Sequence, residues 1–168
     1  MHFAAKRSII VPAPNGYFLY CITTVMIVKK ISAREGLFSM LTNYHTHTTR
    51  CGHAEGTEEE YILTALRCGY KVLGFSDHTP WAYATPGFVS HIRMLPAQLD
   101  DYVLTLRSLR EKYADRLHLH IGLEAEYFPA YLGWLKEETE RLGIEYLILG
   151  CHYDTTDEQD AKARRFGG

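Results

Sequence analysis

The segment Asn43-Tyr44-His45-Thr46-His47-Thr48-Thr49-Arg50-Cys51-Gly52-His53 follows a short run, residues 41–44, that is typical of an extended strand. Residues i and i+2 of a strand point to the same side, so His45 and His47 can aim two imidazoles at one point. Neutral imidazole is a common ligand of zinc, iron and manganese. His53 follows on a loop that can fold back over that point. Two alternating histidines also occur on solvated strands, so this pair alone does not decide between the two interpretations.

The same pattern returns after three further strand-like runs. Asp77 and His78 follow residues 72–76, Glu124 follows residues 117–123, and His152 comes shortly after residues 146–150. In parallel α/β folds, ligands gather at the carboxyl ends of the strands. Four strands that each end in a metal-ligating residue type therefore predict a metal site at one rim of the sheet.

The chain from Met40 onward alternates strands with helices. Thr57 and Glu60 are spaced as a capping box at the start of a helix that ends near Gly69. Pro96 is predicted to begin a second helix, whose apolar residues recur at helical spacing and form core. This order predicts an α/β fold of about four parallel β/α units. The predicted strands are 41–44, 71–76, 117–124 and 146–150, and the second and third helices begin at Pro96 and at Pro129, the third ending at Leu142.

Composition is typical of one globular domain. The 168 residues are 46% hydrophobic and 23% charged, with a net charge of −2. The four cysteines form no CxxC pair, which indicates reduced thiols of a cytoplasmic protein. Residues 40–168 carry a net charge of −6 and no basic stripe, so nucleic acid is not an expected partner.

Residues 1–39 differ from the rest, with a net charge of +4. The apolar run 16–28 is shorter than the roughly 20 residues that a membrane-spanning helix needs. Lys29 and Lys30 follow it directly, and no signal-peptide cleavage site is evident. We therefore expect residues 1–39 to be an extension outside the domain, residues 40–168 to hold the domain, and no membrane association.

These motifs resemble those of the PHP (polymerase and histidinol phosphatase) superfamily, and within it the histidinol-phosphatase branch. The resemblance covers Leu41 to about His152. It rests on the HxH pair at 45–47, the later His53, and the segments Ser76-Asp77-His78, Gly122-Leu123-Glu124-Ala125-Glu126-Tyr127 and Gly150-Cys151-His152. It implies the N-terminal part of a distorted, seven-stranded, TIM-like barrel with a trinuclear site for divalent zinc, manganese or iron at the strand ends.

The resemblance also implies metal-ligand roles. His45 and His47 would hold the first metal, Glu124 would bridge the first and second, and His152 would bind the second. His53 and His78 would bind the third. A carboxylate can bridge two cations about 4 Å apart, and a water activated between them can attack phosphorus. No serine or cysteine nucleophile is then required.

Two further residues are candidates for catalytic roles. Asp77 can orient an imidazole through its second nitrogen, or simply cap the loop. Arg93 lies on the long loop 79–95, and a guanidinium matches the geometry of a phosphate group. A surface arginine is the equally weighted alternative. The role of Glu126 stays open.

The family pattern requires a further histidine and an Asp-x-His after His152, and neither occurs before Gly168. Residues 154–168 read as a polar, solvated tail. Four strands cannot close a barrel, and the fourth would leave an open edge. We therefore expect an incomplete metal site, and a chain that binds metal poorly and has weak activity or none.

Three functions compete at this point. The first is hydrolysis of L-histidinol phosphate, a small phosphorylated substrate, in histidine biosynthesis. The second is another PHP-type hydrolysis, such as that of a nuclease domain. The third is a non-catalytic fragment that binds a partner. The oligomeric state does not follow from the sequence.

Overall fold

The computed structural model describes residues 10–12, 18–20, 42–153 and 155–160. The chain divides into two compact units, residues 1–37 and 38–168. In the first, β1 (Ile10–Pro12) and β2 (Phe18–Tyr20) form an antiparallel pair. Most of the apolar run 16–28 lies outside the described residues, and the placement of residues 1–39 outside the domain stays a prediction. Within the described part, no helix is long and apolar enough to cross a membrane.

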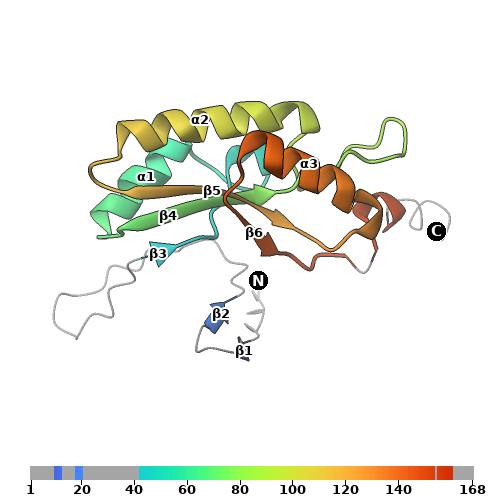
Figure 1. The fold of residues 1–168 in the computed structure, drawn as a ribbon, viewed down its shortest axis with the longest axis horizontal. Coiled ribbons are helices and arrows are strands. Elements are labelled where there is room, and N and C mark those ends of the chain that lie inside the picture. The colour runs from blue at the N-terminus through green and yellow to red at the C-terminus, as the bar shows by residue number, and fades with distance from the viewer. Residues whose placement is uncertain (1–9, 13–17, 21–41, 154, 161–168) are drawn as a thin grey trace, which may run out of the picture. The chain divides into compact units, whose positions relative to one another are not determined.

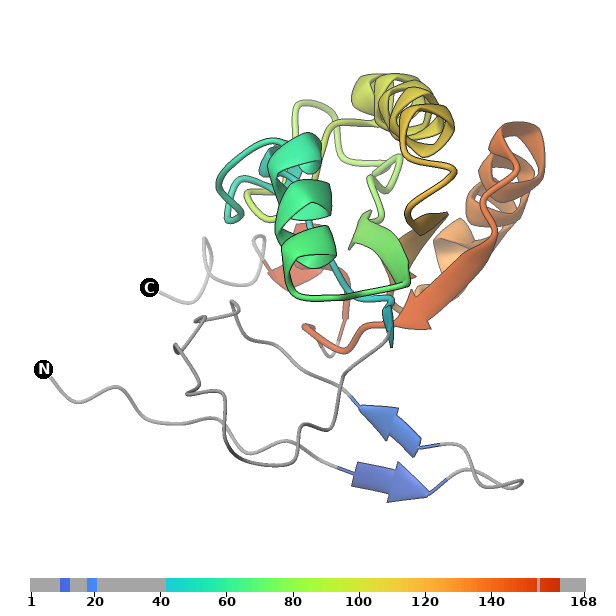
Figure 2. The same cartoon turned by 90° about the vertical axis from the view of Figure 1, so that its left-hand side faces the viewer.

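The second unit contains a four-stranded parallel sheet in the order β3-β4-β5-β6. Its strands are β3 (Thr42–Asn43), β4 (Val72–His78), β5 (His118–Ala125) and β6 (Tyr146–Leu149). The helices α1 (Glu58–Arg67), α2 (Leu99–Lys112) and α3 (Leu132–Leu142) connect them and cover one face of the sheet (Figures 1 and 2). Short 3₁₀ turns at Thr49–Cys51, Pro96–Gln98 and Pro129–Tyr131 precede the helices. The predicted parallel β/α units are confirmed, and the strands form part of a barrel.

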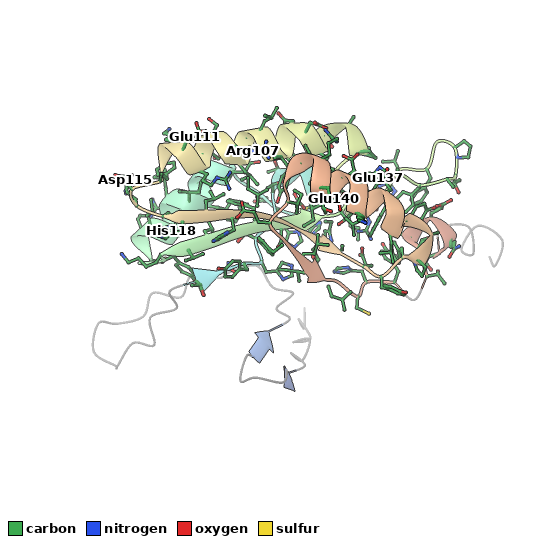
Figure 3. The ribbon with its side chains drawn as sticks, in the orientation of Figure 1. Arg107, Glu111, Asp115, His118, Glu137 and Glu140 are labelled. Carbon is green, nitrogen blue, oxygen red and sulfur yellow. The ribbon has the colours of Figure 1, made fainter. Side chains whose placement is uncertain are left out.

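Local sequence signals set the helix ends. The Thr57 hydroxyl accepts from the backbone N–H of Glu60, whose carboxylate accepts in return from the N–H of Thr57, as the capping box predicts. Gly143 ends α3 in the left-handed conformation, with φ of 58°. Arg107 of α2 donates to the carbonyl of Leu142, which ties α2 to the last turn of α3 (Figure 3).

The core lies between the sheet and the three helices. Phe75 and Ile121 point from the central strands toward the helices, and Leu106 points back from α2. Burial of such a side chain contributes about 1.5–3 kcal/mol, so this layer supplies much of the stability. Tyr102 of α2 is fully buried, and its hydroxyl bridges β4 and β5 by donating to the carbonyl of Gly122 and accepting from the N–H of Asp77.

Most strand boundaries differ from the prediction by one or two residues, and two of these differences affect the site. β3 ends at Asn43, so His45 and His47 follow the strand instead of extending it. The Asn43 side chain accepts from the N–H of His45, and this local bond turns the chain out of the extended path. β4 continues through Asp77 and His78, because the backbone of β5 pairs with it as far as Glu124.

The face opposite the helices is shaped by glycine. The Tyr146 ring lies across Gly74 and Gly122, where an added Cβ would stand 2.9 and 2.5 Å from its Cζ. The Tyr146 hydroxyl donates to the carbonyls of Tyr44 and Phe75. Glycine at these two positions therefore allows one aromatic ring to span the central strands and to link them to the segment that carries the first histidines.

We predict that Gly122→Ala destabilises the chain by about 1–3 kcal/mol, because the added methyl group overlaps the Tyr146 ring. Thermal unfolding followed by circular dichroism measures this as a melting temperature lower by several degrees. Gly133→Ala in α3 is the matched control, since its added Cβ meets nothing within 4 Å. Equal melting temperatures for wild type and Gly122→Ala would show that the ring does not pack there.

Candidate metal centre

The carboxyl ends of β4 and β5 form the base of a histidine-rich site. Parallel register places His78 directly opposite Glu124 on the neighbouring strand. His47 reaches the same place from the loop after β3, with its ring centre 4.6 Å from that of His78. His152 arrives from the segment after β6, 4.7 Å from the ring of His78. Side chains that lie far apart in the sequence therefore meet at this rim.

The first group contains His45, His47 and Glu124. The Nε2 atoms of the two histidines lie 3.0 Å apart, and they stand 3.1 and 3.3 Å from Oε2 of Glu124. Three such atoms at one point can hold a divalent cation. The family resemblance in the sequence also predicted that these three residues serve one metal.

The second group contains His78, His152 and Glu126. Nδ1 of His152 lies 2.8 Å from Oε1 of Glu126, and its Nε2 lies 3.5 Å from Oε1 of Glu124. Nδ1 of His78 lies 3.3 Å from Oε2 of Glu124. The two Glu124 oxygens thus face different imidazoles, as a bridging carboxylate requires.

The third group contains His47, Cys51 and His53. The thiol of Cys51 is buried, donates to the carbonyl of Thr48 and lies 3.7 Å from Nε2 of His53. The ring of His53 is 5.0 Å from that of His78, which keeps these two predicted partners adjacent. His47 is common to the first and third groups.

Asp77 lies behind this site, fully buried. It accepts from the backbone N–H and the hydroxyl of Thr48, and one of its oxygens lies 3.4 Å from Nδ1 of His47. The Asp77 carboxylate thus faces the imidazole of His47 and not the imidazole of the adjacent residue, His78. A catalytic role for Asp77 stays a prediction.

Arg93 is buried, with 4% of its surface exposed. Its guanidinium forms a two-pronged ion pair with Glu126, at 2.9 and 2.7 Å, and its Nε lies 3.0 Å from Oδ2 of Asp157. It also lines a cavity of about 280 Å³ within the loop that includes Trp81 and Phe88. Its predicted phosphate-binding role is untested, but Nε, Nη1 and Nη2 each donate to a carboxylate in this structure.

The predicted solvated tail was wrong for part of its length. Thr156, Asp157 and Glu158 are buried, and residues 157–160 form a helical turn. Tyr83 and Arg93 donate to Asp157, while Thr85 and Tyr131 donate to Glu158. A polar run of acidic residues predicts a hydrated segment, but here hydrogen-bond donors from loop 79–95 and from Tyr131 satisfy the buried carboxylates.

Glu126 and Gly150 are site residues that sequence reasoning did not assign. Glu126 stands two residues after Glu124, just past the end of β5, and that spacing was the available signal. A Cβ at Gly150 would stand 2.9 Å from Cε1 of His152 and 3.0 Å from Oε1 of Glu124. Gly150 thereby leaves room for both side chains; the segment Gly150-Cys151-His152 belongs to the family motifs, but the motif does not indicate this role.

Burial and charge set the protonation of the site. Burial lowers the pKa of His78 to about 3, which keeps its ring neutral. Burial alone would lower the pKa of His47 as well, but hydrogen bonding with Asp77, Cys51 and Glu124 raises that pKa to about 11. The pKa of Glu124 falls below its usual range, because hydrogen bonds from His45 and His47 outweigh the effect of burial.

The residues present fit a divalent cation. Nδ1 of His78 is buried without a well-aligned hydrogen bond, and its nearest acceptor is Oε2 of Glu124 at 3.3 Å, so this atom is costly to bury unless another group approaches it. Neutral imidazoles and an ionised carboxylate are the forms that bind zinc. Chemistry and burial therefore both favour metal at this rim.

A PHP domain model matches residues 43–166. The chain belongs to the PHP domain family. The match spans every histidine and glutamate of the three groups. The family assignment and the half-barrel together confirm the resemblance found in the motifs.

Two curated relatives carry the name "Probable histidinol-phosphatase". The one from Deinococcus radiodurans is 34% identical over 116 residues, which is 67% of this chain and 42% of the relative. The one from Schizosaccharomyces pombe is 29% identical over 115 residues, 65% of this chain and 38% of the relative. The chain thus spans about two fifths of the length of these curated relatives.

Two solved structures share the fold. A candidate histidinol phosphatase from Listeria monocytogenes has a TM-score of 0.56 at 23% identity, over 70% of this chain and 50% of its own. Histidinol phosphate phosphatase from Lactococcus lactis, complexed with zinc, L-histidinol and phosphate, has a TM-score of 0.54 at 18% identity, over 67% and 40%. At these identities the likeness establishes the architecture.

We predict that zinc binding at neutral pH releases about one proton from His47, because its raised pKa leaves it protonated and a metal needs its free nitrogen. Isothermal titration calorimetry in buffers of different ionisation enthalpy counts the released protons. His118→Ala is the control, since His118 lies at the start of β5, at the opposite end from Glu124 (Figure 3). His47→Ala should release fewer protons. Zinc binding with the same heat in every buffer would contradict the raised pKa.

Proposed function

We propose that this chain carries the phosphoesterase site of a metal-dependent phosphomonoesterase that acts on L-histidinol phosphate. The observation that carries the proposal is Glu124, a buried carboxylate whose two oxygens face His45, His47, His78 and His152. Such a group can hold two cations at the separation that two-metal hydrolases use. Membership in the PHP domain family supports the same chemistry.

The proposed site holds zinc, manganese or iron at three positions. His45 and His47 serve the first, Glu124 bridges the first and second, His152 serves the second, and His53 and His78 serve the third. Bound cations would neutralise phosphoryl charge and supply a water that ionises near neutral pH. Asp77 keeps the ring of His47 in place from behind, and Gly150 leaves the space in which Glu124 and His152 face each other.

The substrate assignment draws on the relatives. Both curated relatives are named for histidinol phosphate hydrolysis, and the Lactococcus protein was solved with L-histidinol and phosphate. The net charge of −6 over residues 40–168 argues against tracking a nucleic-acid backbone. We place the reaction in histidine biosynthesis, in the cytoplasm.

We further propose that the 168-residue chain is impaired when it acts alone. Among the described residues, each metal group offers three ligand atoms, and two groups share His47. Within the described part of the chain, no further strand pairs with β3 or β6 at the edges of the sheet, and Leu149 on β6 is 70% exposed. Weak metal retention and slow turnover are therefore expected.

We predict that the chain loaded with zinc or manganese releases phosphate from L-histidinol phosphate, at a rate far below that of the Deinococcus relative assayed in parallel. A colorimetric phosphate assay measures this. His45→Ala should remove the activity because Glu124 and His47 lose their partner, whereas His118→Ala should retain it.

Three results would contradict parts of this proposal. Absence of phosphate release by a zinc-loaded chain would refute the activity. Digestion of single-stranded DNA without phosphate release would favour the nuclease function. A rate equal to that of the Deinococcus relative would refute the proposed impairment but would leave the substrate assignment unchanged.

A further inference from the structure

We propose that Arg93 is a positioning residue that holds the segment carrying His152, and that it does not hold the substrate phosphate. The guanidinium contacts two carboxylates: Glu126, directly after β5, and Asp157, in the helical turn at residues 157–160 that follows His152 in the sequence. We call these three residues the Arg93 clamp. The clamp itself follows from contacts within the chain, while its effect on metal binding rests on the proposed function.

The first arm of the clamp acts through Glu126. Its Oε1 lies 2.7 Å from Nη2 of Arg93 and 2.8 Å from Nδ1 of His152. Oε2 of the same carboxylate accepts from Nη1 of Arg93 and from the indole N–H of Trp81. An ionised carboxylate held by these donors cannot rotate freely. Nδ1 of His152 therefore donates to it, and this fixes the ring with Nε2 toward Glu124.

The second arm acts through Asp157, five residues after His152 in the sequence. Asp157 accepts from Nε of Arg93 and from the hydroxyl of Tyr83. Glu158, the next residue, accepts from Thr85 and Tyr131. The chain after His152 is thereby fixed to loop 79–95. Arg93 therefore acts on His152 in two ways: through Glu126, which bonds the His152 ring, and through Asp157, which holds the segment that follows His152.

Burial explains why an arginine is needed here. The side chains of Arg93, Glu126 and Asp157 are each at most 4% exposed. Two carboxylates removed from water repel each other unless a cation lies between them. A planar guanidinium can bond one carboxylate through both prongs and a second through Nε, which a lysine cannot reproduce.

The same contacts argue against phosphate binding. Nε, Nη1 and Nη2 of Arg93 all donate to carboxylates, and its side chain is 1% exposed. The ring of Phe128 lies 5.9 Å from its central carbon. A phosphate that took these donors would displace Glu126 or Asp157, both of which carry the same sign of charge as the phosphate.

The test compares Arg93→Met with Arg93→Lys in the full chain. Arg141→Met is the matched control, because Arg141 also makes a two-pronged ion pair, with Asp100, but on the surface of α3. Three readouts are measured: hydrogen exchange of residues 148–160 in metal-free protein, the ¹⁵N shifts of the His152 ring, and zinc affinity by competition with a chromophoric chelator.

The clamp predicts faster exchange at residues 150–158 and a mixture of His152 tautomers in Arg93→Met. It also predicts zinc binding that is weaker by about 10–100-fold, the usual effect of losing a group that orients a ligand. Arg93→Lys should recover part of each change, and Arg141→Met should match wild type. If Arg93→Met does not fold, Glu126→Gln is measured by hydrogen exchange and by the His152 ring shifts in metal-free protein, because it keeps the shape of the side chain and removes the charge that orients His152.

The proposal would be overturned if Arg93→Met kept the hydrogen exchange, the His152 tautomer and the zinc affinity of the wild type but bound inorganic phosphate more weakly. That result would favour a phosphate-binding arginine. Failure of the proposed function looks different. In that case the wild-type chain neither retains zinc nor hydrolyses L-histidinol phosphate, while the exchange and tautomer changes in metal-free Arg93→Met still report the clamp.

Discussion

The carboxylate of Glu124 is the group on which the arrangement of this rim depends. It is buried, ionised and within 3.5 Å of four imidazole nitrogens that come from three separate parts of the chain. An ionised group in that position is unfavourable unless positive charge or donors surround it. The histidines satisfy it in the metal-free protein, and cations can take over that role. The same electrostatic requirement thus serves both the fold of the rim and the proposed chemistry.

The sheet supports this rim from below. Side chains that point toward the helices make an apolar layer, and Tyr102 links β4 to β5 through its hydroxyl. On the opposite face, Tyr146 rests on Gly74 and Gly122 and bonds the carbonyl of Tyr44, one residue before His45. The register that sets His78 against Glu124 is therefore locked from both faces.

Buried charge continues outward from the metal centre. Glu126 belongs to the same strand end as Glu124, but it faces Arg93 as well as His152. Through Asp157 the network joins loop 79–95 to the helical turn at residues 157–160. Such networks are stable only when every member is satisfied, so the path of this loop and the position of His152 depend on one another.

Local patterns in the sequence determined much of this fold. Capping signals at Thr57 and Gly143, helical spacing in α2 and apolar strand runs predicted the parallel β/α units. The rule that ligands gather at strand ends brought His45, His47, His78, Glu124 and His152 together as candidates, and the structure places them at one rim. These features follow from residues that are close in the chain or from a general property of parallel sheets.

Only the tertiary structure decided which partner each polar group takes. Asp77 faces His47, and Arg93 meets Asp157 across 64 positions of sequence. Residues 156–158 are buried although their composition is typical of a solvated tail. Loop 79–95 has no periodic pattern, so its path depends on long-range packing and on the pairing of buried charges. No local signal encodes that pairing, because its energy exists only once the distant segments have met.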